Sequence, residues 1–344
     1  MVVDIKLCMN IDFVVTWLDA NDPDWLALYN KYRNVKAHKD DKGRYRNWDL
    51  FKYWFRAVEN YAPWVNKVFL VTNGKNPDWI DPNHPKLVLV KHSDYMPEKY
   101  LPTFNSRAIE LNFHRIPGLS EHFVYFNDDM FINRPVHPEY YFKNGLPCDS
   151  NEETLFFNPS WDPQNKFSTK ISIYCDIAIL NYHFNRRDVV KAAKLKWLGP
   201  HLGISGILTS ILLGYSSHFQ FFKWRHYEQP MLKSVIQEIW DVEGDMADKS
   251  CTQFRQDVSF NPYIIRYWQF ASNKFVPMKL KRGKLYTVEK RLLGDIVKVL
   301  LEKKVYSVCL NDTPYCSDLD YEESKRVITE VLEKKFPQKS QFEK

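Results

Sequence analysis

The chain has 344 residues, of which 44 % are hydrophobic, and a net charge of +6. This length allows one large or two ordinary domains, and the composition is that of a globular protein with a sizeable core. The charge excess is small and no basic run is interleaved with aromatic residues, which argues against a nucleic-acid-binding protein. Only 11 glycines are present, so we expect no glycine-rich phosphate loop.

Six cysteines are scattered through the chain, and no two of them form a Cys-x-x-Cys pair. Residues 1–10 lack the basic start and apolar stretch of a signal peptide. We therefore expect free thiols and a cytoplasmic location. The longest apolar stretch, residues 202–215, is shorter than the roughly 20 residues that a membrane-spanning helix needs. It is expected to be a core helix, and the alternative is a segment that touches a membrane surface or an acceptor.

Short apolar strands alternate with helices in the first 135 residues. The periodicity predicts strands at 11–17, 68–71, 87–90 and 123–126, helices at 48–61 and 106–116, and a loop over 31–46. This order predicts an α/β fold with a mostly parallel, nucleotide-binding sheet, GT-A-like or Rossmann-like, and helices on both faces. Residues 1–135 are expected to form this nucleotide-binding unit.

The second half, residues 136–344, is expected to be mixed and largely helical, and to pack onto the first half as one compact body. Residues 136–220 are less regular. Helices are predicted at 229–242, 286–304 and 321–335, and residues 263–270 are strongly apolar and aromatic.

The fourth strand ends in Asn127-Asp128-Asp129. Ligands of such sheets bind beyond the carboxyl ends of the strands. Adjacent carboxylates there suit Mg²⁺ or Mn²⁺, which usually take one or two carboxylates together with substrate phosphates. The alternative is a turn with an Asx cap.

The first strand also carries carboxylates. Asp12 lies at the start of a strand that should be buried, so it needs a partner. Asp19 follows the strand, in what can equally be a solvated acidic turn. Trp17 can stack on a base, although core packing is the simpler interpretation.

Three further segments carry groups that can bind an anion or move a proton. Asn105, Ser106 and Arg107 stand at an expected helix start, which makes either an anion site or an ordinary capped helix. His226 can act as a general base, or as a phosphate donor if protonated, although a lone histidine is more often structural. Arg255 can clamp a phosphate.

Taken together and in order, these segments resemble the Stealth family of sugar-phosphate transferases. That family includes bacterial capsule polymerases and the catalytic subunit of the animal lysosomal-enzyme N-acetylglucosamine-1-phosphotransferase. Its four motif blocks correspond to segments between residues 11 and 312. The matching positions include Asp12, Thr16, Trp17, Arg56, Asn73, Asn105, Ser106, Glu110, Arg115, Asn127, Asp128, Asp129, His226, Arg255 and Asp312. The chain departs from the family where Leu18-Asp19-Ala20 replaces Val-Asp-Gly.

The resemblance implies a reaction. A sugar-1-phosphate would pass from a nucleotide-diphospho-sugar, a UDP-sugar, to a hydroxyl of an acceptor glycan, and UMP would leave. Asp128, Asp129 and Asp312 would hold Mg²⁺ or Mn²⁺. Catalysis would involve Asp128, Asp129, His226 and Arg255, with Asp129 or His226 as the base. The donor and its phosphates would be bound by Asp12, Thr16, Trp17, Asp19, Arg56, Asn73, Asn105, Ser106, Arg107 and Arg115.

The same resemblance implies a bacterial enzyme of capsule or exopolysaccharide synthesis whose acceptor is an oligosaccharide or a lipid-linked glycan. The basic helix over 291–304 and the stretch 202–215 can then touch the inner membrane face. Two alternatives remain open: a metal-dependent GT-A glycosyltransferase that releases UDP, and a non-catalytic carbohydrate-binding homologue.

Overall fold

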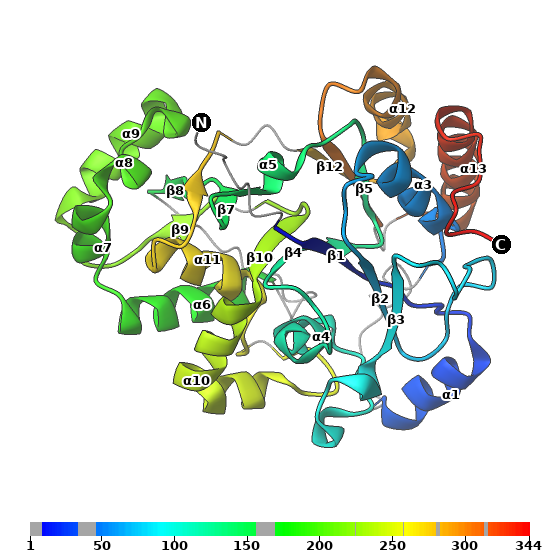
Figure 1. Cartoon of the computed structure of the whole chain (residues 1–344), viewed down its shortest axis with the longest axis horizontal. Coiled ribbons are helices and arrows are strands. Elements are labelled where there is room, and N and C mark those ends of the chain that lie inside the picture. Colours follow the sequence, from blue (N-terminus) through cyan, green and yellow to red (C-terminus); the bar gives the residue numbers. More distant parts are fainter. Residues whose placement is uncertain are drawn as a thin grey trace, which may run out of the picture.

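A five-stranded sheet forms the centre of the computed structural model, which describes residues 9–33, 46–155, 169–223, 225–256, 258–279, 283–312 and 316–344 (Figure 1). The strand order is β10-β4-β1-β2-β3. β1, β2, β3 and β4 are parallel, and β10 runs antiparallel to β4. The strands are β1 Ile11–Thr16, β2 Val68–Thr72, β3 Leu87–Lys91, β4 His122–Asn127 and β10 Gln229–Leu232.

The register brings the carboxyl ends of the parallel strands into line. Thr16 at the end of β1 is opposite Val71 of β2 on one side and Asn127 of β4 on the other. The polar residues that follow these strands therefore lie along one edge of the sheet, as the sequence predicts.

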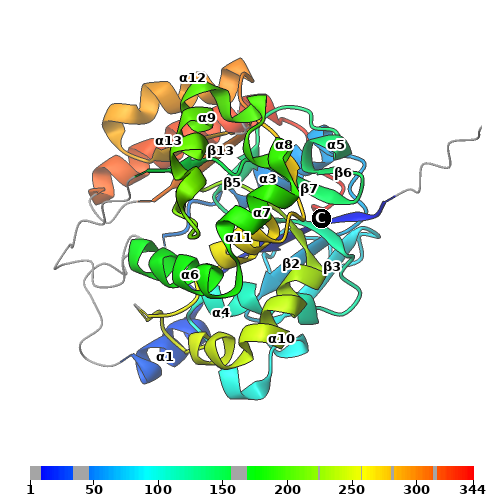
Figure 2. The same cartoon turned by 90° about the vertical axis from the view of Figure 1, so that its left-hand side faces the viewer.

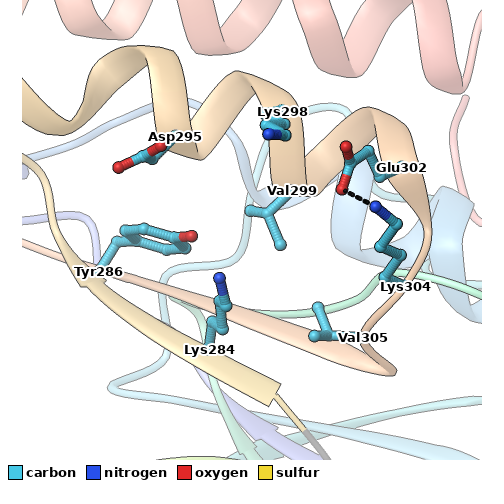
Figure 3. Close-up of a pocket in the computed structure, with 8 residues that line it drawn as sticks. All are labelled: Lys284, Tyr286, Asp295, Lys298, Val299, Glu302, Lys304 and Val305. Atoms are coloured by element: carbon cyan, nitrogen blue, oxygen red, sulfur yellow. Dashed lines mark ion pairs between the residues drawn. The ribbon is translucent and has the colours of Figure 1, made fainter.

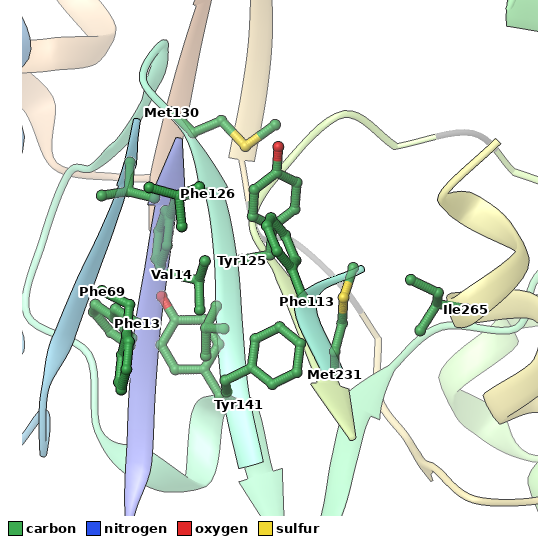
Figure 4. Close-up of a cluster of buried hydrophobic side chains, with 14 of the residues drawn as sticks. Phe13, Val14, Phe69, Phe113, Tyr125, Phe126, Met130, Tyr141, Met231 and Ile265 are labelled. Carbon is green, nitrogen blue, oxygen red and sulfur yellow. The ribbon is translucent and has the colours of Figure 1, made fainter. Parts of the chain in front are cut away.

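Aromatic side chains pack on both faces of the sheet, and Figure 4 shows Phe113, Tyr125 and Phe126 among them. Trp54 of α3 (Phe51–Tyr61) packs on Phe126 with ring centroids 5.4 Å apart. On the other face Phe113, which follows α4 (Ser106–Leu111), packs 5.1 Å from Tyr125. Because Tyr125 and Phe126 are neighbours on β4, their side chains point to opposite faces. The predicted α/β class with helices on both faces is confirmed.

Three smaller sheets surround the centre. β5 (Met130–Ile132) pairs with β13 (Ser307–Asn311), which pairs with β12 (Gly283–Thr287). β7 (Leu146–Asp149) lies between β6 (Phe142–Lys143) and β11 (Val276–Pro277). β8 (Glu153–Thr154) pairs with β9 (Phe221–Phe222).

Helices make up most of the second half, as predicted. The remaining helices are α1 Pro23–Tyr32, α5 Pro138–Tyr141, α6 Thr169–His183, α7 Arg186–Ala192, α8 Lys194–Trp197, α9 Gly203–Leu212, α10 Lys233–Ser250, α11 Tyr263–Ala271, α12 Leu293–Glu302 and α13 Asp318–Lys335.

Several predicted boundaries were wrong. Residues 229–232 form strand β10 and not the start of a helix. Residues 286–287 belong to strand β12, and the helix predicted over 286–304 is limited to α12. The acidic turn after β1 leads into α1, which the sequence analysis missed, and most of the loop expected over 31–46 lies outside the described residues. Residues 136–220 contain four α-helices in their second part.

Candidate active site

The turn Asn127-Asp128-Asp129 is held in place by a strand from the far end of the chain. Asp129 accepts a backbone hydrogen bond from Leu310 (2.9 Å), and Met130 pairs with Cys309 in the β5–β13 ladder. The acidic pair is therefore fixed between the central sheet and β13. The motif of two adjacent carboxylates does not by itself reveal this contact.

Asp129, His226 and Cys309 form a group in which one ligand atom from each residue lies within 4.8 Å of the others. The Cys309 thiol donates to Oδ2 of Asp129 at 3.2 Å. Oδ1 of Asp129 is buried and has no hydrogen-bond partner in the described part of the chain. A buried carboxylate oxygen that lacks a donor is costly unless a ligand or ion completes it.

The charge of Asp129 acts on its two neighbours, Asp128 and Cys309. Asp128 is exposed at the surface, yet desolvation by the surrounding protein and the charge of Asp129 raise the pKa of Asp128 to about 7. Desolvation and the same Asp129 charge also hold the pKa of Cys309 well above its ordinary value, so its thiol stays protonated. This donor set fits a divalent cation carried mainly by the carboxylates, because a protonated thiol is a poor metal ligand.

His226 joins this turn through side-chain contacts. Its Nε2 lies 3.5 Å from Nδ2 of Asn127, and its Nδ1 lies 3.4 Å from the Tyr263 hydroxyl, which donates to the carbonyl of Arg225 (2.9 Å). This network assigns the proton to Nδ1, because the Tyr263 hydroxyl already uses its own proton. Nε2 then keeps a lone pair that faces Asn127.

Tyr125 connects the acidic turn to a second polar group. Its hydroxyl donates to Oδ1 of Asn127 (2.5 Å) and lies 3.4 Å from Oγ1 of Thr16. Tyr125 also interacts electrostatically with Glu110 of α4.

Glu110 lies between an aromatic hydroxyl and two cations. Desolvation raises the pKa of Glu110 to about 7, against the opposing charges of Arg255 and Arg107 and the hydrogen bonds from Tyr125 and Ser106. Arg255 in turn donates to the Ser106 hydroxyl. A carboxyl with a raised pKa beside charged partners is a frequent feature of functional sites.

The predicted phosphate-binding segment is partly structural. Asn105 is fully buried and caps α4, accepting from the backbone N–H of Arg107 while its amide donates to Thr252. The buried Arg107 donates to Gln256 (3.2 Å) and Ser259 (3.1 Å). Asn105 and Arg107 therefore hold the loop that carries Arg255 against α4.

Two predicted donor-binding residues lie away from this site. Asp12 is at the opposite, amino end of β1, and its oxygens accept from Asn66 (2.7 Å), Lys67 (3.2 Å) and Ser120 (2.8 Å). The buried carboxylate of Asp12 therefore has the hydrogen-bond partners that its burial requires, and these partners belong to the surrounding fold. These contacts favour a structural role for Asp12, and its expected role at the donor stays an untested prediction.

Arg56 likewise serves the fold. Its buried guanidinium makes two bonds of 2.7 and 2.8 Å to the carboxylate of Glu343 and a third to the carbonyl of Phe336. These contacts attach the C-terminal segment to α3. The guanidinium is engaged by these contacts, and the donor-binding role of Arg56 stays an untested prediction.

Trp17, Asp19 and Asn73 lie at the predicted edge without joining the polar network. Trp17 stacks on Phe51 (ring centroids 6.1 Å apart) and packs against the core. Asp19 and Asn73 each accept a backbone N–H two residues ahead, in the acidic turn and after β2. Their donor-binding roles remain predictions.

Arg115 and Asp312 are placed outside the group of Asp129, His226 and Cys309. Arg115 is exposed and stacks over Trp240 of α10 at 4.7 Å. Asp312 follows β13 and lies 3.9 Å from Arg46. Among the described residues, Asp312 is not part of that group.

Two pockets lie outside the polar network. One, of about 310 Å³, lies between β12 and α12 and is lined by Lys284, Tyr286, Asp295, Lys298, Val299, Glu302, Lys304 and Val305 (Figure 3). The other, of about 430 Å³, is lined by Asn21, Arg46, Asn47, Asp49, Asp318, Tyr321, Glu322 and Lys325. The second is polar and borders Arg46, the partner of Asp312.

Sequence comparison identifies the family. The chain is 38 % identical over 339 residues to the capsular polysaccharide phosphotransferase WcwK of Streptococcus pneumoniae, covering 97 % of this chain and 99 % of the relative. The chain belongs to the Stealth family. The profile described as Stealth protein CR2, conserved region 2, matches residues 44–149, which include Glu110 and the acidic turn.

Other matches agree with this family. The Stealth chain is 35 % identical to the exopolysaccharide phosphotransferase cps2G of Lactiplantibacillus plantarum, over 97 % of this chain and 96 % of the relative. Relatives of this kind show that the Stealth chain is a transferase. The solved galactosyltransferase LgtC, in complex with donor and acceptor sugar analogues, aligns with a TM-score of 0.39 and 9 % identity over 96 % of this chain and 98 % of LgtC. That likeness is too weak to support an inference about the reaction.

Proposed function

We propose that this Stealth chain transfers a sugar-1-phosphate from a UDP-sugar to a hydroxyl group of a glycan acceptor in cell-surface polysaccharide synthesis. The observation that carries the proposal is one connected polar site at the carboxyl edge of the sheet. It contains a carboxylate pair, a histidine whose Nε2 faces the Asn127 side chain, and an arginine beside a raised-pKa glutamate. Phosphoryl transfer needs these groups for positioning and for neutralising charge.

In the proposed reaction, the acceptor oxygen forms a bond to the β-phosphorus of the donor. The bond from that phosphorus to the bridging oxygen of the pyrophosphate breaks, and UMP leaves with that oxygen. The sugar–phosphate bond stays intact, so the product is a phosphodiester. A glycosyltransferase would break the bond at the anomeric carbon and release UDP.

The acceptor proton must go to a base, and we assign His226 to this role. Its Nε2 keeps the lone pair, while Tyr263 and the carbonyl of Arg225 fix the other nitrogen. Asp129, close to the ring, would stabilise the imidazolium that forms. A base positioned in this way contributes typically about 10²- to 10⁴-fold.

Asp128 and Asp129 are assigned to cation binding. The unpaired buried Oδ1 of Asp129 is the atom that most needs a positive partner. Mg²⁺ or Mn²⁺ bound by these carboxylates would neutralise charge on the donor pyrophosphate. Arg255, which reaches Ser106 near Glu110, is assigned to the phosphoryl oxygens.

The free thiols bear on where the enzyme works. In the described part of the chain, Cys175, Cys251, Cys309 and Cys316 form no disulfide. Free cysteines are normal in a reducing compartment. We propose a cytoplasmic location, where the glycan would be built on an oligosaccharide or lipid-linked acceptor.

The test is the identity of the released nucleotide. The purified chain is incubated with Mg²⁺, an acceptor glycan and a panel of nucleotide sugars, and UMP, GMP and UDP are separated by chromatography. We expect UMP, together with a phosphodiester signal in the phosphorus NMR spectrum of the product. Release of UDP with no phosphorus in the product would show glycosyl transfer instead.

A further inference from the structure

Helix α9 turns small residues toward the protein and large apolar residues toward solvent. Its buried positions are the small residues Gly206 and Ser210, whereas Ile204, Leu208 and Ile211 are exposed. A Cβ at Gly206 would come within 2.8 Å of Leu202, so the inward face is too tight for a larger residue. A surface helix of a globular protein normally turns its large apolar side chains toward the core.

The exposed side chains continue beyond α9. Leu195 of α8 is 87 % exposed, Ile204 is 83 % exposed, and Tyr215 just after α9 is 93 % exposed. We call the following set the apolar ridge: Leu195, Ile204, Leu208, Ile211, Leu212 and Tyr215. Ile204, Leu208, Ile211 and Tyr215 recur three or four residues apart, so they share one face of the segment, and exposed apolar faces of this kind mark interaction surfaces in soluble proteins.

The shape of the segment argues against a membrane-spanning helix. The stretch Lys194–Tyr215 is long and apolar enough to cross a membrane by length and composition, and 33 % of its 18-residue apolar window is buried inside the protein. However, α8 ends at Trp197, and α9 has only 10 residues. A helix of that length extends about 15 Å, half of the roughly 30 Å hydrocarbon core of a bilayer. The segment is therefore suited to lie along a surface.

The charges around the ridge favour an anionic surface. Residues 197–222 contain no Asp, Glu, Lys or Arg. Arg187, Lys191 and Lys194 are exposed just before the ridge, with Asp188 as the one exposed acidic residue among them. An apolar face edged by basic residues and ending in an exposed tyrosine is typical of segments that bind anionic lipid headgroups.

The apolar ridge lies on an outer side of the molecule, where a membrane surface can contact it. Helices α7, α8 and α9 form one side of the molecule, opposite α12 and α13 (Figure 1), and face the viewer together in Figure 2. By contrast, the basic helix α12 buries Ile296, Val299 and Leu300 and packs against α13. Of the two predicted membrane-contacting segments, only the one around α9 presents its apolar face outward.

We propose that the apolar ridge inserts into the interface of an anionic membrane, with Arg187, Lys191 and Lys194 at the headgroups. The inference is independent of the chemistry at the carboxyl edge.

The test is co-sedimentation of the full chain with vesicles of phosphatidylglycerol mixed with phosphatidylcholine, compared with phosphatidylcholine alone. We expect the wild type to pellet with the anionic vesicles and to be released by high salt. The double variant Ile204→Gln/Leu208→Gln should lower the partition coefficient by about tenfold or more, because it removes inserted apolar area. Lys191→Gln/Lys194→Gln should lower binding to the anionic vesicles only.

Matched controls use exposed residues elsewhere. Leu301→Gln/Leu319→Gln changes two exposed leucines on α12 and α13, and Lys143→Gln/Lys334→Gln removes two exposed charges. Both should bind vesicles as the wild type does, and circular dichroism confirms that every variant is folded. A wild type that stays in the supernatant, or a ridge variant that binds equally well, would overturn the proposal. So would light scattering that shows a dimer which the ridge variant abolishes, without any vesicle binding, because a second copy would then cover the ridge.

Discussion

Asp12 and Asp129 lie at opposite ends of the central sheet, and their carboxylates differ in how fully they are hydrogen bonded. At the amino end, the carboxylate of Asp12 accepts three hydrogen bonds, from Asn66, Lys67 and Ser120. At the carboxyl end, Asp129 has one oxygen bonded to the Cys309 thiol and the other buried without a donor.

This difference separates a structural carboxylate from one available to a ligand. Folded proteins satisfy nearly all their buried polar atoms, and a buried oxygen without a donor needs a physical reason. At the amino edge, the fold itself supplies the hydrogen-bond donors that satisfy the buried carboxylate of Asp12. At the carboxyl edge, we propose that a cation bound together with the donor pyrophosphate is the positive partner of Asp129.

The largest expected effect is on catalysis at Asp129. Asp129→Asn keeps the shape and an acceptor for Cys309, but it removes the charge. We expect kcat/KM to fall about 10³-fold, roughly 4 kcal/mol of transition-state stabilisation. Thermal stability should be unchanged or higher, since repulsion with Asp128 is lost. Initial rates of UMP release and a melting curve measure both, with Asp245→Asn, on an exposed residue of α10, as control.

Asp12→Ala should show the reverse pattern. Three donors lose a buried charged acceptor, so the free energy of unfolding should fall by about 3 kcal/mol. The folded fraction should keep its kcat/KM. Urea unfolding and rates measured well below the unfolding transition check this. A large loss of kcat/KM in a stable Asp12→Ala protein would place Asp12 in the site after all.

His226→Gln tests the base assigned to the carboxyl edge. We expect kcat to fall at least about 100-fold, roughly 2.7 kcal/mol, with little change in KM, because the group acts on a proton and does not hold the donor. His137→Gln, on an exposed histidine, is the matched control. An unchanged kcat would leave Asp129 as the candidate base.

The smallest effect is expected for Glu110, through the pH dependence of stability. The pKa of Glu110 is raised to about 7 from its ordinary 4.5. The folded state therefore holds this proton more tightly, and stability falls as pH rises from about 4.5 to about 7. Glu110→Gln should remove this loss, on the order of 2 kcal/mol. Urea unfolding across that range measures it, and Glu98→Gln, an exposed glutamate, should keep the wild-type slope.

The central strands could be predicted because each is a short apolar run ending in polar residues. The acidic turn could be placed at the carboxyl edge for the same reason. Strand β10 could not be predicted, because a proline such as Pro230 in front of a helical pattern indicates the start of a helix. The structure places Pro230 on an edge strand, where the missing N–H is tolerated.

The contacts that complete the site could not be predicted, because they join distant parts of the chain. Cys309 is 180 residues from Asp129, and it was interpreted as an ordinary thiol. Tyr263 and Tyr125 gave no signal, since aromatic residues are mostly core. Glu110 did lie within a matching motif, but its link to Arg255 depends on a loop from the other half of the chain. The hydrogen bonds of Asp12 and Arg56 within the fold could not be predicted either, because a motif position does not say whether a charge serves the fold or the ligand.

The most direct test follows the phosphorus atom itself. A UDP-sugar labelled with radioactive phosphorus at the β-position is incubated with the wild type and with Asp129→Asn in the presence of the acceptor. We predict that the wild type moves the label into the glycan and releases unlabelled UMP, while Asp129→Asn moves almost none. Label that stays with the nucleotide as UDP, while the sugar reaches the acceptor, would contradict the account.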